Sequence, residues 1–152
     1  NYRTDEIVYK FQSWKPDTFD EAEEFIDNYS YNGNIIFKKW NQLGVYLKDN
    51  DKLVGDLGFC LNDSELAVIG FTVAKEFQNK GFAYEAMIKL LDFIFNELKV
   101  NVILAQTDPK NIPSIKLLEK LEFQNRGTVE NSEHFDNEWK EDLVFVKKRR
   151  LP

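Results

Sequence analysis

The sequence predicts an α/β fold of the α+β type, and a junction near the middle of the chain indicates it most clearly. Residues 65–73 are apolar and rich in β-branched side chains, which is typical of a largely buried strand. Residues 82–98 carry apolar side chains at helical spacing and predict an amphipathic helix. Three further segments have strand patterns, at residues 101–107, 123–129 and 141–148. Strands and helices are therefore expected to share one core.

Local signals predict the elements before that junction. Thr18, followed three residues later by Glu21, has the spacing of a capping box and begins a predicted helix that ends near Tyr29. Residues 40–47 and 52–60 are predicted to form a hairpin, because a polar turn separates two β-favouring runs. The residues before Trp14 show no clear pattern, and their structure stays open.

A short helix is predicted after the strand at 101–107. Asn111 has the side chain of a helix N-cap, and Pro113 is tolerated because it falls in the first turn. Ile115, Leu118 and Leu121 recur on one face, which is expected to pack on the sheet.

Composition limits the classes of protein. A length of 152 residues suits one domain, and 43% hydrophobic residues exclude a disordered chain. No apolar run approaches the roughly 18 residues of a membrane span, so neither a membrane segment nor a secretory leader is expected. One cysteine, Cys60, and one histidine, His134, exclude a disulfide framework and disfavour a zinc site. We therefore expect a cytoplasmic protein without a bound metal.

The charge balance bears on partners. Asp and Glu number 26 against 20 Lys and Arg, a net charge of −6, which disfavours nucleic-acid binding and attracts cationic substrates.

The polar loop at residues 78–81 leads directly into the long helix. Unpaired N–H groups and the positive dipole end at a helix start suit an anion. Gly81 allows close backbone approach, and Lys80 adds a charge. The loop matches neither a Walker motif nor a dinucleotide fingerprint, because Gly81 is the only glycine between Gly70 and Gly127. A structural linker is the alternative interpretation.

Two blocks resemble a known family. Gln78-Asn79-Lys80-Gly81-Phe82-Ala83 resembles the Q/R-x-x-G-x-G/A loop of the GNAT superfamily of acetyl-CoA-dependent N-acetyltransferases. Residues 107–123 resemble the segment N-x-x-S-x-x-x-L-x-K-L-G-F, in the form typical of the RimJ/RimL-like branch, which includes ribosomal-protein N-terminal acetyltransferases. The resemblance runs from about residue 14 to 146. It implies a single acetyltransferase domain over residues 1–152.

The resemblance also implies a mixed, largely antiparallel central sheet flanked by helices. GNAT proteins usually begin with a strand and a helix before the stretch that residues 8–14 resemble. The first strand is therefore expected to be missing here, unless the sequence starts late or a second copy supplies that strand in a homodimer.

By the same resemblance, acetyl-CoA binds between the two central strands. The edge of one strand is expected to bond the pantetheine arm, the loop and helix start to hold the diphosphate, and the short helix to contact the arm from the other side. The residues expected at these places are Phe71, Thr72, Val73, Gln78, Asn79, Lys80, Gly81, Phe82, Ala83, Tyr84, Asn111 and Ser114. For Asn111 the alternative is an N-cap without a cofactor role.

Catalysis requires that the acceptor amine loses a proton and that the leaving thiolate is stabilised. The tyrosine acid of many GNAT proteins is Leu118 here, so Ser114 is the predicted proton donor, the alternative being a locally bonded helix residue. Val68 replaces the glutamate that the branch commonly has, which leaves Glu65 as the predicted base, with Asp56 as the other nearby acid. Either could instead be a solvated carboxylate.

The acceptor is expected to be a small-molecule or peptide amine bound by residues 14–40 and 131–139, and Tyr84 and His134 are further candidates to face the cleft. Deprotonating a lysine at pH 7 costs about 4–5 kcal/mol, but an α-amine only about 1 kcal/mol. A protein N-terminus therefore needs less base catalysis. Two alternatives lack catalysis: a CoA-binding module without turnover, and an interaction domain whose glycine loop is only structural.

Overall fold

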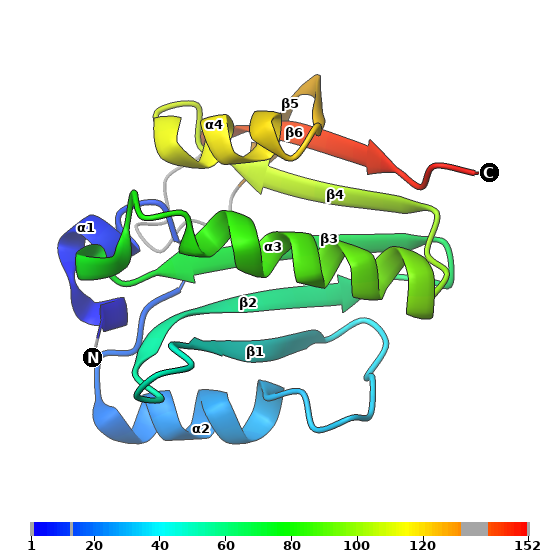
Figure 1. The fold of residues 1–152 in the computed structure, drawn as a ribbon. Helices are drawn as coiled ribbons and strands as arrows, with labels where there is room; N and C mark the ends of the chain where they lie inside the picture. Colours follow the sequence, from blue (N-terminus) through cyan, green and yellow to red (C-terminus); the bar gives the residue numbers. More distant parts are fainter. Residues whose placement is uncertain (1, 13, 132–139, 152) are drawn as a thin grey trace.

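The computed structural model describes residues 2–12, 14–131 and 140–151 (Figure 1). The helical elements are η1 (Tyr2–Thr4), α1 (Glu6–Tyr9), α2 (Phe19–Tyr29), η2 (Lys75–Phe77), α3 (Phe82–Asp92), η3 (Phe93–Glu97) and α4 (Ile112–Lys120). The strands are β1 (Trp40–Tyr46), β2 (Leu53–Leu61), β3 (Leu66–Val73), β4 (Val102–Thr107), β5 (Gln124–Asn131) and β6 (Lys140–Lys148).

The strands form one sheet in the order β1-β2-β3-β4-β6-β5. Every neighbouring pair is antiparallel except β3 and β4, which are parallel and joined through α3. This arrangement confirms the predicted mixed, largely antiparallel sheet. No strand precedes β1 in the described part of the chain, and residues 2–9 form η1 and α1 instead.

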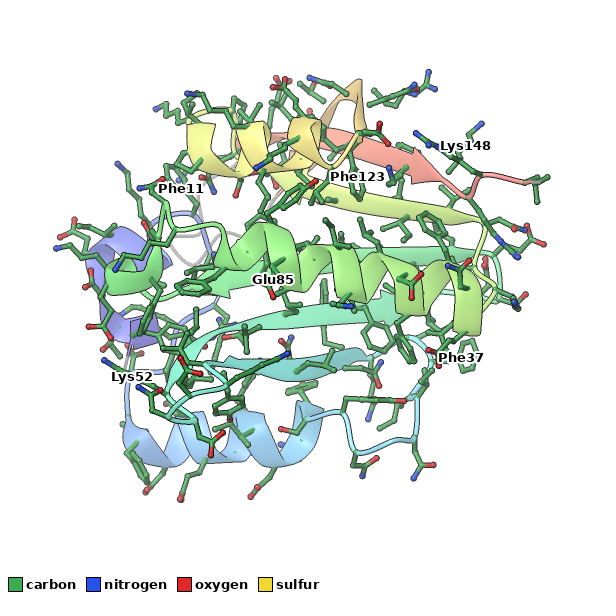
Figure 2. The ribbon with its side chains drawn as sticks, in the orientation of Figure 1. Phe11, Phe37, Lys52, Glu85, Phe123 and Lys148 are labelled. Carbon is green, nitrogen blue, oxygen red and sulfur yellow. The ribbon has the colours of Figure 1, made fainter. Side chains whose placement is uncertain are left out.

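Helices α3 and α4 lie on the same face of the sheet, and α2 lies beside the edge strand β1 (Figure 1). The core lies between α3 and the sheet, where Met87, Ile94, Phe59 and Ile103 are fully buried. Figure 2 draws the side chains of the described residues on the same view of this face of the sheet. The apolar periodicity that predicted α3 therefore corresponds to its packing face.

The long predicted helix changes its winding near its end. After Asp92 the chain forms one π turn over Phe93–Glu97, in which the N–H of Leu98 donates to the carbonyl of Phe93 at 3.1 Å. The wider turn buries two successive side chains, Ile94 and Phe95, which a regular helix face accommodates less readily. No helix in the described ranges is long and apolar enough to cross a membrane.

The pairing between β3 and β4 stops before either strand ends. It runs from Leu66 opposite Val102 to Ile69 opposite Ala105. Beyond that point β3 continues to pair with β2 as far as Val73, and β4 pairs with β6 as far as Thr107. The two central strands therefore diverge at their C-terminal ends and leave an opening in the middle of the sheet.

Glu122 stands where the resembled family usually has glycine, and its φ of 64° lies in the left-handed region. A residue with a Cβ pays about 1 kcal/mol there. The Glu122 carboxylate lies 2.7 Å from the Arg150 guanidinium and 3.5 Å from the Lys147 ammonium, contacts that offset part of this cost.

Candidate active site

The loop between β3 and α3 has the conformation that an anion site requires. Gly81 is the N-cap of α3 with a φ of 83°, and a Cβ placed on it would meet nothing within 4 Å. The Gln78 side chain donates its Nε2–H to the carbonyl of Val73 at 3.0 Å, which fixes the start of the loop against the end of β3. The backbone at Gly81 is therefore open to a ligand.

The amides that follow are available. Within the described residues, the N–H groups of residues 79–84 donate to no protein acceptor, whereas that of Gln78 donates to Lys75. The Lys80 ammonium lies 5.9 Å from the Phe77 ring and is exposed. Six free amides, a helix N-terminus and a lysine together suit a diphosphate, the anionic part of CoA.

The opposite side of the opening carries Asn111 and Ser114. The Asn111 side chain caps α4 by accepting the N–H of Ser114 at 3.4 Å, so its predicted capping role is confirmed. This bond uses only Oδ1 and leaves the amide N–H₂ for another partner. The Ser114 hydroxyl enters no hydrogen bond with the described residues. Both side chains line the cavity described next.

A cavity of about 590 Å³ passes through the opening between β3 and β4. Of the predicted cofactor residues, it brings together four, Phe71, Thr72, Asn111 and Ser114. The others, Val73, Gln78, Asn79, Lys80, Gly81, Phe82, Ala83 and Tyr84, lie at the end of β3, in the adjoining loop and in the first turn of α3 rather than in its lining. Val68 and Leu118 also line it.

Aromatic side chains wall the part of the cavity that faces α2. Trp14, Phe25, Tyr29 and Trp40 line it. The Trp14 and Phe25 rings stack with centroids 4.4 Å apart, and the Phe25 and Tyr29 rings are 5.1 Å apart. The structure thus places an aromatic wall where the sequence predicted the acceptor region. The other predicted segment includes His134. Its residues 132–139 are not among those that the structure describes.

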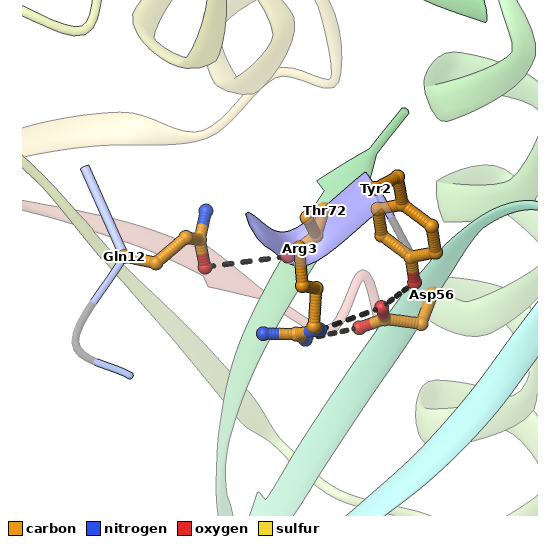
Figure 3. Close-up of polar contacts among 5 residues, drawn as sticks. All are labelled: Tyr2, Arg3, Gln12, Asp56 and Thr72. Carbon is orange, nitrogen blue, oxygen red and sulfur yellow. Dashed lines mark hydrogen bonds and ion pairs between the residues drawn. The ribbon is translucent and has the colours of Figure 1, made fainter. Parts of the chain in front are cut away.

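Asp56 on β2 is the centre of a polar network in this cavity (Figure 3). The Arg3 guanidinium donates to both carboxylate oxygens, from Nη2 at 2.6 Å and from Nε at 3.1 Å, and the Tyr2 hydroxyl donates to Oδ2. Burial, and then the Asp56 charge, raise the pKa of Tyr2. Burial alone would lower the pKa of Arg3, but the charge and hydrogen bonds of Asp56 outweigh it and raise that pKa.

A second contact ties the N-terminal segment to the sheet. The Thr72 hydroxyl on β3 donates to the Gln12 side-chain oxygen at 3.2 Å (Figure 3). Residues 2–12 are therefore held against both β2 and β3 and form one wall of the cavity.

The two candidate bases differ from expectation. Glu65 is exposed, precedes β3 and accepts a hydrogen bond from Asn101 at 3.2 Å. It lies at the end of β3 opposite the opening and does not line the cavity, so this structure does not support it as the base. Asp56, for which a solvated carboxylate was the alternative, is instead the partner of Arg3 in a partly buried ion pair. Its partners come from more than 50 residues away, which no local pattern reveals.

Sequence reasoning missed Asp142. This carboxylate on β6 is only 4% exposed and lines the cavity. Because side chains alternate along a strand, it faces the side of the sheet opposite Leu143 and Phe145. It follows Lys140 and Glu141 and so resembles a solvated residue at the start of the strand, and no local signal marks it.

Comparison with known proteins agrees with this geometry. Residues 1–124 match the model of the acetyltransferase (GNAT) domain family. The uncharacterized N-acetyltransferase p20 of Bacillus licheniformis is 35% identical over 135 residues, which cover 87% of this chain and 75% of that protein. A GNAT-family acetyltransferase from Bacillus anthracis has a similar structure, with a TM-score of 0.82 and 26% identity over 97% of this chain and 84% of the other.

A protein of Vibrio cholerae assigned as a ribosomal-protein-serine acetyltransferase shares the fold, with a TM-score of 0.74 and 24% identity over 87% of this chain and 76% of its own. The predicted enzyme class is confirmed, and the two alternatives without catalysis are disfavoured. With a family model matching most of its length and a relative above 30% identity, the chain belongs to the GNAT family and is an N-acetyltransferase.

Proposed function

We propose that this enzyme transfers the acetyl group of acetyl-CoA to a primary amine bound in the cavity. The observation that carries the proposal is the set of unpaired amides at residues 79–84, beside an opening in the sheet that leads to the cavity. Unpaired amides at a helix start favour a diphosphate, and the opening offers a path from there to the acceptor.

The residues divide the binding of acetyl-CoA among them. The amides of residues 79–84 hold the diphosphate, and Lys80 adds its charge. The edge of β3 at Phe71, Thr72 and Val73 offers backbone groups to the pantetheine arm, since β4 no longer pairs with it there, although the Val73 carbonyl already accepts the Gln78 side chain. The free N–H₂ of Asn111 reaches the arm from α4. Tyr84, held under the Lys120 ammonium at 4.1 Å, shapes the start of α3.

The chemistry that acetyl-CoA supplies when bound is a thioester that a neutral amine can attack. The Ser114 hydroxyl, free of other described partners and lining the cavity, donates its proton toward the departing sulfur and recovers one from water. Direct attack needs no covalent enzyme intermediate, so Cys60, which burial gives a raised thiol pKa, is not a nucleophile here.

The preferred acceptor class is a peptide α-amine, as in the RimJ/RimL-like branch. An α-amine costs only about 1 kcal/mol to deprotonate at pH 7. This fits a cavity in which Asp56 is engaged by Arg3 and Tyr2 and Glu65 is remote. The similarity to a protein assigned as a ribosomal-protein-serine acetyltransferase favours the same class, although at the level of the fold.

A transfer assay tests the proposal. Purified enzyme is incubated with acetyl-CoA and a panel of peptides with free N-termini, Nα-blocked lysine peptides, polyamines and aminoglycosides, and released thiol and acetylated product are measured together. We expect thiol release with free N-terminal peptides above that with their Nα-blocked counterparts. Acetylation of lysine side chains at equal or higher rates would contradict the acceptor class, and no product from any amine would contradict the reaction.

Two further expectations belong to the proposal. The free thiol of Cys60 agrees with a reducing, cytoplasmic location, which fractionation of cells can test.

A homodimer is proposed because β1 is an edge strand with Trp40 and Tyr46 exposed. Light scattering on the purified protein measures its mass in solution, and a monomer at all concentrations would contradict the dimer.

A further inference from the structure

The acceptor half of the cavity contains an ion pair that acetyl transfer does not use. The side chains of Arg3 and Asp56 are 14% and 15% exposed, and two hydrogen bonds join them. Separating such a pair leaves an uncompensated charge in a poorly solvated place, which is strongly unfavourable. The pair therefore remains formed while an acceptor enters.

The Arg3 guanidinium also contacts the aromatic wall. Its central carbon lies 5.8 Å from the centroid of Trp14 and 5.4 Å from that of Phe25. A carboxylate beside two aromatic faces is a typical site for an organic cation. In this protein an arginine of the same chain fills that site.

Two other carboxylates line the cavity, and they lie on the far side of the opening. Asp108 follows β4 and Asp142 is on β6, whereas Asp56 is on β2. Strands β3 and β4 separate β2 from β6, which is a distance of roughly 14 Å at the usual strand spacing. Acidic side chains therefore line the cavity on both sides of the opening, and on the β2 side Arg3 and the aromatic rings accompany the acid.

We propose that Arg3 is a specificity-determining residue that excludes acceptors with a second cationic group. The Asp56 carboxylate and the Trp14 and Phe25 rings would bind such a group, but Arg3 already holds them. The net charge of −6 attracts polyamines to the protein surface, but the cavity offers no unoccupied carboxylate and ring pair to bind their second ammonium group at Asp56. The enzyme therefore selects amines whose remaining part is neutral or apolar. This inference rests on the proposed function in taking the cavity as the acceptor site.

The experiment measures spermidine binding by isothermal titration, without acetyl-CoA, to the wild type and to Arg3→Met. Removing the guanidinium frees the rings and leaves the Asp56 carboxylate with the Tyr2 hydroxyl in place of the ion pair, so we expect Arg3→Met to bind spermidine at least tenfold more tightly than the wild type. The double variant Arg3→Met/Asp56→Asn should lose this gain. Lys15→Met is the matched control, because Lys15 also pairs with an aspartate and contacts an aromatic ring but does not line the cavity.

Equal spermidine affinity of the wild type and a folded Arg3→Met variant overturns the proposal, and so does an equal gain in Lys15→Met. Circular dichroism establishes that each variant is folded. If Arg3→Met does not fold, the rates at which the wild type acetylates spermidine and propylamine are compared instead. Acetylation of spermidine as fast as that of propylamine overturns the proposal, and a rate at least tenfold lower supports it. A parallel titration with acetyl-CoA separates this inference from the proposed function, since spermidine binding is measured without the cofactor.

Discussion

The cofactor half of the proposed site and its acceptor half are built in different ways. Most of the cofactor half comes from one stretch, in which β3, the loop with Gly81 and the first turn of α3 follow one another, and α4 adds Asn111 and Ser114. The acceptor half comes from distant residues: Arg3 and Asp56 are 53 positions apart, and Gln12 and Thr72 are 60 apart. The cofactor half depends on the geometry of a few successive residues, so few substitutions there leave it intact. The acceptor half is made of several distant segments, so a single substitution in any one of them can change its specificity.

The largest predicted effect concerns the stability of the acceptor half. Asp56→Ala leaves the partly buried Arg3 guanidinium without its carboxylate and should lower the free energy of unfolding by about 3 kcal/mol, the lower end of the range for buried pairs. Urea unfolding followed by circular dichroism measures it. Asp17→Ala, which removes the carboxylate of the exposed pair with Lys15, is the control and should leave the midpoint nearly unchanged. Equal losses of unfolding free energy in Asp56→Ala and Asp17→Ala would contradict the stabilising role of the pair between Arg3 and Asp56.

The next effect concerns catalysis at the opening between the halves. Ser114→Ala should lower kcat about 100-fold with little change in KM, because it removes the proposed proton donor to sulfur. The helix cap survives, since Asn111 accepts the backbone N–H of Ser114 rather than its hydroxyl. Steady-state kinetics with Ser64→Ala, a change in an exposed turn, provide the comparison. An unchanged kcat would show that Ser114 takes no part in the chemistry.

A smaller effect tests the cofactor half. Gly81→Ala introduces a Cβ into the open space beside the amides, at a positive φ, and should weaken CoA binding about tenfold. Gly33→Ala is a matched control, because Gly33 also has a positive φ and open space but belongs to an exposed loop that does not line the cavity. Isothermal titration measures both. Equal losses would indicate a backbone effect instead of a binding one.

The smallest effect is a dependence on pH. The raised pKa of Tyr2 means that folding favours its protonated form, so its contribution is complete below the ordinary value of 10.0 and is lost as the pH rises above it. Tyr2→Phe should lower stability by about 1 kcal/mol at neutral pH, through the lost hydrogen bond to Asp56, and should reduce the alkaline loss. Urea unfolding of the wild type and of Tyr2→Phe is measured between pH 8 and 11. If the free energy of unfolding depends on pH in the same way in both proteins, the raised pKa of Tyr2 is contradicted.

The same contrast explains what the sequence could predict. Side chains that act on their own neighbourhood were recognised correctly: Thr18 caps α2 by accepting the N–H of Glu21, Asn111 caps α4, and α3 begins directly after Gly81. Their geometry depends on two or three successive residues. The β-favouring runs and the polar turns between them likewise predicted the six strands of the described residues within a few residues of their ends.

Features that depend on distant segments were not predictable. From the sequence, Asp56 resembles a solvated strand carboxylate. In the structure its carboxylate accepts hydrogen bonds from Arg3 and Tyr2, which are distant in sequence. Glu65 was close in sequence to the central strand, but lies at the wrong end of it. The π turn at Phe93–Glu97 depends on how two successive side chains are buried. These outcomes are set by tertiary packing, which no local spacing encodes.

The central claim is that the amides of residues 79–84 bind the diphosphate of CoA. The most direct measurement is a two-dimensional ¹H–¹⁵N spectrum of labelled protein, titrated with CoA and, separately, with pantetheine, which lacks the diphosphate. The account predicts that CoA shifts the amide signals of residues 79–84 more than any others, and that pantetheine shifts those near Phe71 to Val73 but leaves the loop unmoved. Loop signals that stay in place at saturating CoA would contradict it.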